Sequence, residues 1–366
     1  MEQHRDISER EKKLLTVLGN QPNISQKELL TLTTYSRTSS LIRKIKQLKE
    51  ENYLTGPTYT VDLGKLSKNP VRGFRCIVEY EKDLNTVIDY LQMIEPLHWV
   101  YPVLSSHKDL LNALFLSSDD RKLESLLQLL KDNNIITDYS IRVSRCHLKV
   151  ENPNFFGDPL PSLDNLLEPC EFPDLSYGCY STAWNECDIR TLSYLVGGFE
   201  SIKLMDILRN ERKLHNKEWT YEQIKYSFEK MSKNKLISKF YLISPFPLEQ
   251  CSSFYLFIKS DDTETMQRIV YNFARGGRIH REYGLFGDWG LIGCICHSQF
   301  VVNLMHKLDS IEEIEKKELY HLRSFTPGVQ YTGKYSEFDY FDVETQTLEY
   351  PYDVFRGKIE EKLEKK

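Results

Sequence analysis

Apolar residues recur at helical spacing in three short stretches at the start of the chain. Capping boxes at Ser8 and Ser25 predict where the first two helices begin, and residues 37–51 form the third stretch. A polar turn separates the second helix from the third, and Thr58–Val61 is expected to be a wing strand in a hairpin. Three short helices, a tight turn and a hairpin predict a winged helix-turn-helix.

From residue 73 the pattern changes to alternation, which predicts strands. Strand, helix, two strands, helix and strand follow one another to about residue 143, which is the order of a ferredoxin-like βαββαβ fold. The second half repeats this plan. Phe254–Lys259 matches Phe74–Glu79, which lies 180 positions earlier, and Thr220 again caps a third helix.

The predicted fold class is therefore α+β, with two winged helix-turn-helix domains and two ferredoxin-like domains in tandem. The first pair is followed by an acidic, proline-rich linker and the second pair by an aromatic, acidic tail. In chain order, the six expected segments are 1–70, 71–150, 151–183, 184–250, 251–326 and 327–366. The linker is expected to be an extended strap. The tail is too rich in aromatic residues to stay free, so we expect it to dock on the chain's own body or on a partner.

Composition narrows the class of protein. The 366 residues are 40% hydrophobic and 28% charged, as is ordinary for a globular protein. No apolar run reaches the roughly 18 residues that span a bilayer, and the charged N-terminus lacks a signal-peptide core. The eight cysteines are scattered and are expected to be reduced thiols, so we expect a cytoplasmic protein.

The net charge of −5 conceals a basic third helix. Residues 1–70 carry 12 Lys and Arg against 8 Asp and Glu, and no acid lies between positions 37 and 49. In a helix-turn-helix, the N-terminal residues of this helix face base edges while flanking cations neutralise phosphates. A solvated helix face is the alternative interpretation. The residues predicted to contact double-stranded DNA are Ser36, Arg37, Thr38, Ser39, Ser40, Arg43, Lys44, Lys46 and Lys49.

The chain resembles the leucine-responsive regulatory protein (Lrp/AsnC) family as two fused copies covering about 300 residues. Three stretches carry this resemblance: Ile7–Leu15, the apolar frame from Leu41 to Leu54, and Leu285–Trp289 with its Gly-Asp turn. The family implies DNA-binding transcription regulators that dimerise through the sheet domain, often assemble further and often respond to amino acids.

The sequence departs from this family pattern in both copies. The first copy has Ser106–Asp109 in place of the Gly-Asp turn, so an amino-acid effector is expected near Gly287 and Asp288 of the second copy. Glycine permits φ > 0 there, and Asp288 can accept a hydrogen bond from an α-amino group, although a plain hairpin turn explains both residues as well. The second helix-turn-helix carries an insertion, Glu211–Glu218, and mixes acids into its third helix. Direct DNA contact by this helix is left open.

The spacing of the cysteines does not favour a metal site. Cys170, Cys179 and Cys187 are too far apart for the close pairs that structural zinc sites use. Cys294 and Cys296 share one face of a strand and are interpreted as core residues. We therefore expect no metal and no cofactor.

The leading hypothesis is a transcription regulator and not an enzyme, with no catalytic residue. The alternative is a tetrapyrrole-modifying enzyme similar to siroheme decarboxylases, which share this domain plan. In that case Arg278, His280, Arg281 and Tyr283 would bind acidic side chains and supply a proton, although they equally suit a strand edge or subunit contact. A structural protein that has lost DNA binding is a third hypothesis, against which the basic helix argues.

The two sheet domains are expected to pair within one chain as a pseudo-dimer. The linker of about 35 residues is long enough to cross a small domain, and tethering raises the effective concentration of the second copy. A homodimer of such units remains compatible with this arrangement. Double-stranded DNA and an amino-acid effector are the expected partners, and no membrane is expected.

Overall fold

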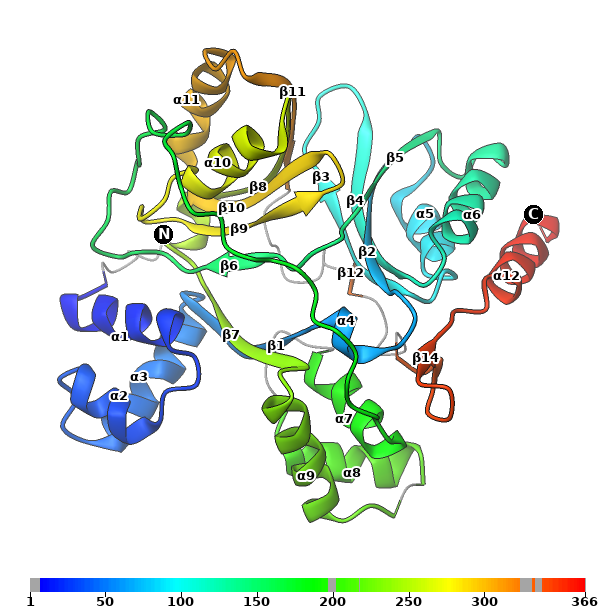
Figure 1. The fold of residues 1–366 in the computed structure, drawn as a ribbon, viewed down its shortest axis with the longest axis horizontal. Coiled ribbons are helices and arrows are strands. Elements are labelled where there is room, and N and C mark those ends of the chain that lie inside the picture. The colour runs from blue at the N-terminus through cyan, green and yellow to red at the C-terminus, as the bar shows by residue number, and fades with distance from the viewer. Residues whose placement is uncertain (1–6, 197–201, 217, 323–330, 333–337, 366) are drawn as a thin grey trace. The chain divides into compact units, whose positions relative to one another are not determined.

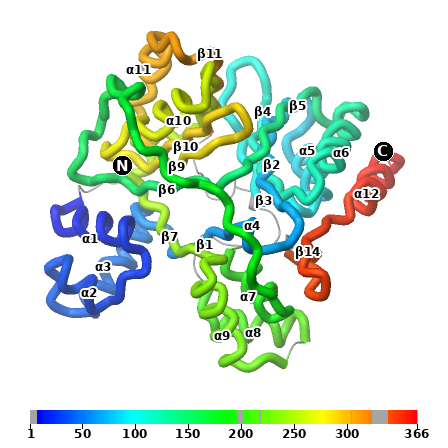
Figure 2. The backbone as a smooth tube through the Cα atoms, in the orientation of Figure 1, coloured from blue at the N-terminus to red at the C-terminus, as the bar shows by residue number. Residues whose placement is uncertain are grey.

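The computed structural model describes residues 7–196, 202–216, 218–322, 331–332 and 338–365 (Figure 1). The chain divides into two compact units, each built from both halves of the sequence. Unit 1 combines Met1–Thr58, Cys146–Leu175 and Lys239–Ser324, and unit 2 combines Tyr59–Arg145, Ser176–Ser238 and Phe325–Lys366. The N-terminal helices, blue in Figure 2, thus share a unit with the sheet of the second half, most of whose strands are yellow to orange.

Unit 1 begins with the three predicted helices, α1 (Glu9–Asn20), α2 (Gln26–Leu32) and α3 (Thr38–Glu50). Both predicted capping boxes are formed, and they fix the starts of α1 and α2. Leucines at helical spacing meet in one core: Leu14, Leu15, Leu18, Leu29, Leu41 and Leu48.

The predicted wing hairpin is wrong. Strand β1 (Leu54–Val61) pairs with β7 (Ile237–Ile243), which follows the third helix of the second half, in a two-stranded sheet. The Ser244 N–H donates to the Tyr53 carbonyl at 3.0 Å at the unit 1 end of this pair. Each copy supplies one strand, so a pattern read within one copy could not identify the partner.

The sheet of unit 1 has the order β11-β8-β10-β9-β6. Its elements in chain order are β6 (Lys149–Glu151), a 3₁₀ turn (Leu248–Gln250), β8 (Cys251–Ser260), α10 (Thr263–Asn272), β9 (His280–Phe286), β10 (Trp289–His297), α11 (Ser298–Asp309) and β11 (Ile314–His321). Helices α10 and α11 cover one face, where Phe254, Leu256 and Ile258 of β8 are buried. Strand β6 pairs with β9 as an edge strand and ends at Glu151, where the predicted linker begins.

The sheet of unit 2 has the equivalent order β12-β3-β4-β2-β5. Its elements in chain order are β2 (Arg72–Tyr80), α5 (Leu84–Leu91), β3 (Leu97–Val103), β4 (Asp109–Ser117), α6 (Asp120–Asp132), β5 (Asp138–Val143) and β12 (Tyr331–Thr332). Phe74, Cys76 and Val78 point to the face that α5 and α6 cover.

Unit 2 also holds α4 (Leu63–Leu66) and the second helical module, α7 (Glu186–Val196), α8 (Leu204–Leu214) and α9 (Tyr221–Lys233). The first four residues of the predicted insertion, Glu211–Leu214, form the end of α8. Thr220 caps α9 in a capping box, as predicted.

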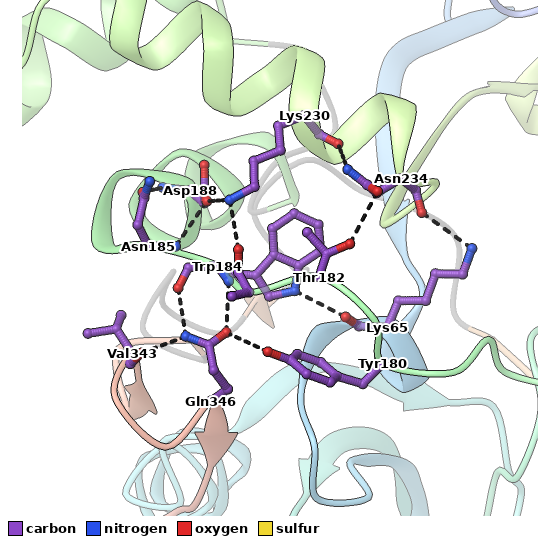
Figure 3. Close-up of polar contacts among 11 residues, drawn as sticks. Lys65, Tyr180, Thr182, Trp184, Asn185, Asp188, Lys230, Asn234, Val343 and Gln346 are labelled. Carbon is purple, nitrogen blue, oxygen red and sulfur yellow. Dashed lines mark hydrogen bonds and ion pairs between the residues drawn. The ribbon is translucent and has the colours of Figure 1, made fainter.

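The described part of the aromatic tail packs within unit 2, as expected. It forms β13 (Phe341–Asp342), β14 (Thr347–Leu348) and α12 (Tyr352–Glu364). Phe355 and Ile359 are fully buried in the unit 2 core, and the Tyr352 hydroxyl accepts from the Ser118 N–H at 3.0 Å. Gln346 ties the tail to the segment before α7: it accepts from the Trp184 N–H at 2.7 Å and donates to the Trp184 carbonyl at 2.8 Å (Figure 3).

The described elements form an α+β structure. In the described residues, no helix is long and apolar enough to cross a bilayer. All eight cysteines are free thiols, and within the described ranges no three His, Cys, Asp or Glu side chains gather as they would around a metal ion.

Candidate functional site

The most unusual polar side chains of unit 2 lie on the sheet face opposite α5 and α6. Register places Arg75 of β2 beside Arg142 of β5, and Ile77 beside Asn112 of β4. Trp99 and Tyr101 of β3 continue the same face, because they pair with Leu114 and Asn112. We name the set Arg75, Trp99, Tyr101, Asn112 and Arg142 the arginine face.

Both guanidinium groups of the arginine face are buried. Arg75 is 2% exposed and Arg142 is 8% exposed. Arg75 lies over the Trp99 ring, with its central carbon 4.8 Å from the ring centroid, and the Trp99 and Tyr101 centroids are 4.8 Å apart. A guanidinium group packed on an aromatic ring, with a second guanidinium group beside it, has chemistry suited to a flat anionic molecule.

Asn112 is the residue of the arginine face whose burial is not explained by contacts within the described part of the protein. Its side chain is fully buried, and among the described residues neither Nδ2 nor Oδ1 has a hydrogen-bond partner. A buried amide without a partner costs about 1–3 kcal/mol relative to a satisfied one. Such a cost is commonly retained where a ligand or water completes the hydrogen bonds.

The corresponding face of unit 1 has different chemistry. At the 180-residue offset, Tyr255 stands where Arg75 does, and pairing from β8 places Leu291, Tyr320 and Glu282 at the positions of Asn112, Arg142 and Trp99. Two cations, an amide and an indole are thus replaced by two phenols, an aliphatic side chain and an acid. Within unit 1 these positions do not suit an anion.

The polar residues that sequence reasoning singled out on β9 are occupied by internal contacts of unit 1. Arg281 is 2% exposed and donates twice to Glu151 Oε2, at 2.9 and 2.7 Å. It also donates to the carbonyls of Tyr271 and Phe273 at the end of α10. The Tyr283 hydroxyl donates to Glu151 Oε1 at 3.0 Å, and burial raises the pKa of this phenol well above its usual value. These contacts fix the strap to β9, and the strand-edge interpretation accounts for them.

His280 and Arg278 also serve packing. His280 Nδ1 lies 3.3 Å from Asn152 Oδ1, and burial lowers the pKa of the imidazole to about 4. The imidazole is therefore neutral at pH 7. Arg278 donates to the Pro245 carbonyl at 2.9 Å and lies 4.4 Å from the Phe246 ring centroid. The proposed tetrapyrrole-binding role of these β9 residues gains no support from their contacts.

Helix α3 presents only part of the predicted DNA-binding set to solvent. Ser36, Arg37, Thr38, Ser39 and Arg43 are exposed and Ser40 is half-buried. Lys44 instead pairs with the buried Glu11 at 2.8 Å. Lys46 is exposed and pairs with Glu50 at 3.4 Å. Lys49 is half-buried near the end of the helix. The N-terminal end of α3 is the part that the fold leaves accessible for base contacts.

Gly287 and Asp288 form the two-residue turn between β9 and β10. Gly287 has φ +64°, which explains the glycine, and Asp288 pairs with Lys259 at 2.8 Å. Asp288 is 66% exposed. The expected effector site therefore lies on an exposed hairpin turn and stays a prediction.

No family model matches the sequence, and no curated protein matches it. Among solved structures, the siroheme decarboxylase NirDL matches with a TM-score of 0.51 and 13% identity, over 98% of this chain and 100% of that chain. Its complex with an iron-uroporphyrin III analogue matches with a TM-score of 0.50 and 12% identity, over 90% of this chain and 96% of the other. The chain thus shares its whole-length fold with this protein.

Lrp/AsnC regulators match part of the chain. A transcriptional regulator of Neisseria meningitidis in complex with L-Met is 14% identical, with a TM-score of 0.31. The match covers 38% of this chain and 90% of the regulator. The leucine response regulatory protein of Mycobacterium tuberculosis is 17% identical over 38% of this chain and 92% of its own, with a TM-score of 0.29.

These comparisons correct the expectation that the chain is not an enzyme, because the protein whose fold matches the whole chain is an enzyme. The residues of the arginine face were missed by sequence reasoning. Their signal was present: Arg75 and Arg142 each interrupt an otherwise apolar or alternating strand, in FRCIVEY and DYSIRV.

Proposed function

We propose that the chain is an enzyme that acts on a polycarboxylated tetrapyrrole, which it binds at the arginine face of unit 2. The observation that carries the proposal is the buried pair Arg75 and Arg142 beside the unsatisfied amide of Asn112. The whole-length likeness to siroheme decarboxylase supports it.

Each residue of the arginine face suits one part of such a substrate. Arg75 and Arg142 would bind peripheral carboxylates through charge-assisted hydrogen bonds, which are roughly twice as strong as neutral ones. Asn112 would supply one further donor and acceptor. Trp99 would pack against the flat macrocycle.

The proposed reaction is decarboxylation of an acetate side chain. The bond between the methylene carbon and the carboxyl group breaks, CO₂ leaves, and the electron pair remains on the methylene carbon. A proton then binds to that carbon and leaves a methyl group, so the step requires no oxidant. Tyr101 lies on the same face and carries an exchangeable proton.

The test is titration of the full chain with iron-uroporphyrin III, followed by its absorbance spectrum, and anaerobic incubation with siroheme, followed by mass spectrometry. We expect one ligand per chain, since the equivalent positions of unit 1 lack cations, and product masses reduced by CO₂. Arg75→Gln and Arg142→Gln should each weaken binding about 10- to 100-fold, as expected for loss of a charge-assisted hydrogen bond. Arg121→Gln, on the exposed surface of α6, is the matched control.

Two results would overturn the proposal. One is equal affinity of the Arg75→Gln, Arg142→Gln and Arg121→Gln variants for iron-uroporphyrin III. The other is tight binding of siroheme without any loss of CO₂, which would leave a tetrapyrrole-binding protein and remove the catalytic step.

A second candidate function, DNA binding by α3, is favoured by one observation. Arg37, Thr38, Ser39 and Arg43 lie exposed at the start of a helix that has no acid in its first turn. Cations there suit phosphates and hydroxyls suit base edges. Electrophoretic mobility of random-sequence DNA with the full chain tests this function, and it is independent of tetrapyrrole binding.

A further inference from the structure

The sheet face of unit 2 that carries the two buried arginines is ordered in rows. Strands β3, β4, β2 and β5 lie side by side (Figure 1), so residues that pair across them form lines that cross the strands. We name the first line the cationic row: Trp99, Leu114, Arg75 and Arg142. The neutral row lies two residues further along each strand, roughly 7 Å away: Tyr101, Asn112, Ile77 and Ser140.

The two arginines of the cationic row are direct neighbours. Arg75 pairs with Arg142 across β2 and β5, and side chains in such pairs leave the sheet about 4.5–5.5 Å apart. A guanidinium group is always charged in a protein, so two positive charges lie beside each other at positions that are 2% and 8% exposed. Two carboxylates on neighbouring carbon atoms of a ligand match such a pair, whereas carboxylates on opposite sides of a macrocycle do not.

Tetrapyrroles differ in whether they carry such neighbouring carboxylates. Each pyrrole ring of a uroporphyrin has an acetate and a propionate on adjacent carbon atoms. In a coproporphyrin a methyl group replaces each acetate, so every ring keeps a single carboxylate. The cationic row therefore has the chemistry to distinguish the two classes, because only a uroporphyrin-type ring offers one carboxylate to each arginine.

The neutral row has the chemistry that suits a carboxylate about to be lost. None of its four side chains is charged at neutral pH. Asn112 is fully buried, and both polar atoms of its amide lack a hydrogen-bond partner among the residues that the structure describes. A cation bound to the reacting carboxylate would stabilise the starting state more than the transition state, because the negative charge leaves that group together with CO₂. An uncharged amide can orient the carboxylate with much less of this effect.

We propose that the arginine face holds a uroporphyrin-type ligand in one orientation, an inference that rests on the proposed tetrapyrrole site. Arg75 and Arg142 bind the acetate and the propionate of one ring, and that ring does not react. The neighbouring ring lies over the neutral row, where its acetate contacts Asn112 and Tyr101 and loses CO₂. The arginines thus determine which tetrapyrroles bind, and the neutral row determines which acetate reacts.

The experiment compares the affinities of the full chain for iron-uroporphyrin III and iron-coproporphyrin III by absorbance titration. We expect the unmodified chain to bind the first at least about 10-fold more tightly, since one more charge-assisted hydrogen bond forms. Arg75→Gln should weaken uroporphyrin binding by that factor and coproporphyrin binding less than about threefold, because Arg142 still holds a single carboxylate. The preference should then largely vanish. Arg121→Gln, at an exposed position of α6, should retain it.

Turnover of siroheme separates the roles of the two rows. Arg75→Gln should raise KM about 10-fold and change kcat less than about threefold, because the ring that Arg75 binds keeps its contacts in the transition state. Asn112→Leu should lower kcat about 10-fold or more at saturating siroheme, because this amide contacts the reacting acetate. Arg75→Lys keeps the charge and loses only the planar fork, so its KM should lie between those of Arg75→Gln and the unmodified chain.

Three results would overturn the inference. Equal affinity of the unmodified chain for both porphyrins, with both weakened in Arg75→Gln, would leave the proposed site in place but show that the arginines do not share one ring. A fall in kcat with unchanged KM in Arg75→Gln would place the reacting acetate at the cationic row. Binding of neither porphyrin would overturn the proposed function itself, and the orientation with it.

Discussion

Glu11 and Lys44 form an ion pair that ties the first helix of the N-terminal module to its third. Glu11 Oε1 lies 2.8 Å from Lys44 Nζ, while Glu11 Oε2 accepts from the Ser8 N–H at 2.8 Å. The second helical module repeats this arrangement: Asp188 pairs with Lys230, and Asp188 Oδ2 accepts from the Asn185 N–H at 2.9 Å. One acid at the third position of the first helix thus caps that helix and binds a lysine of the third helix.

We therefore expect Lys44→Met to destabilise the N-terminal module, because it leaves the carboxylate of Glu11, 1% exposed, without its cation. Removing one partner of a buried pair costs about 3–5 kcal/mol, and the 23% exposure of the Lys44 side chain places the expected cost nearer 2–3 kcal/mol. Urea unfolding at pH 7 measures it. The double variant Glu11→Gln/Lys44→Met should recover most of the loss, and a double variant as unstable as the single one would contradict this account.

DNA affinity should depend on different residues from those that hold the module together. Arg37→Ala and Arg43→Ala remove exposed cations, so each should reduce the slope of log affinity against log salt by about 0.9. Lys46→Ala, which loses a cation paired with Glu50, should reduce it less. The measurement is DNA affinity across a salt series. Equal slopes in all three variants and the unmodified chain would place any DNA site elsewhere.

Asn112→Leu separates a ligand-binding role from a packing role at the arginine face. The substitution replaces a buried amide without partners by an apolar side chain of similar size, so the free energy of unfolding should stay unchanged or rise by about 1–2 kcal/mol. Affinity for iron-uroporphyrin III should fall about 10-fold or more. A stability loss with unchanged affinity would show that Asn112 has hydrogen bonds inside the protein and no part in binding.

The sequence predicted local structure well where the physical cause is local. Ser8, Ser25 and Thr220 each precede a helix and form the predicted capping boxes, because cap and partner are three residues apart. The alternation of residues 74–80 likewise predicted β2. The order of helices and strands in both halves followed from such signals.

The features that the sequence did not predict depend on pairing between segments that lie far apart in the chain. Strand β1 pairs with β7 some 180 residues away, so the expected hairpin was wrong. Arg75 and Arg142 meet only because β5 pairs with β2 in one particular register, and no spacing along the chain indicates that. Conversely, Arg281 was considered as a ligand-binding residue, but the strap brings Glu151 to it and occupies it internally.

Gly287→Ala tests whether Gly287 serves only the backbone geometry of the turn between β9 and β10 or also an effector site. The substitution meets no atom within 4 Å, so its cost should be conformational, about 1 kcal/mol for a left-handed residue. Thermal unfolding measures it, with Asp288→Ala expected to change stability little because the Asp288 side chain is 66% exposed. Stabilisation by an amino acid that disappears in both variants would place the effector at this turn, as the family resemblance predicts.

The buried imidazole of His280 should make the protein less stable in mild acid. Its pKa is about 4 in the folded chain because burial disfavours the charged form, whereas an unfolded histidine binds a proton below about pH 6.5. Between these pH values the unfolded state binds more protons than the folded state. The free energy of unfolding is therefore highest above about pH 6.5, as far as His280 determines it, and it falls as the pH is lowered towards about 4. The loss is at most about 3 kcal/mol.

His280→Asn retains a donor to Asn152 and should remove this part of the pH dependence, as measured by urea midpoints at pH 7.5 and pH 5. His107→Asn, at an exposed position, is the control, and an unchanged pH dependence in His280→Asn would show that other groups cause the acid sensitivity.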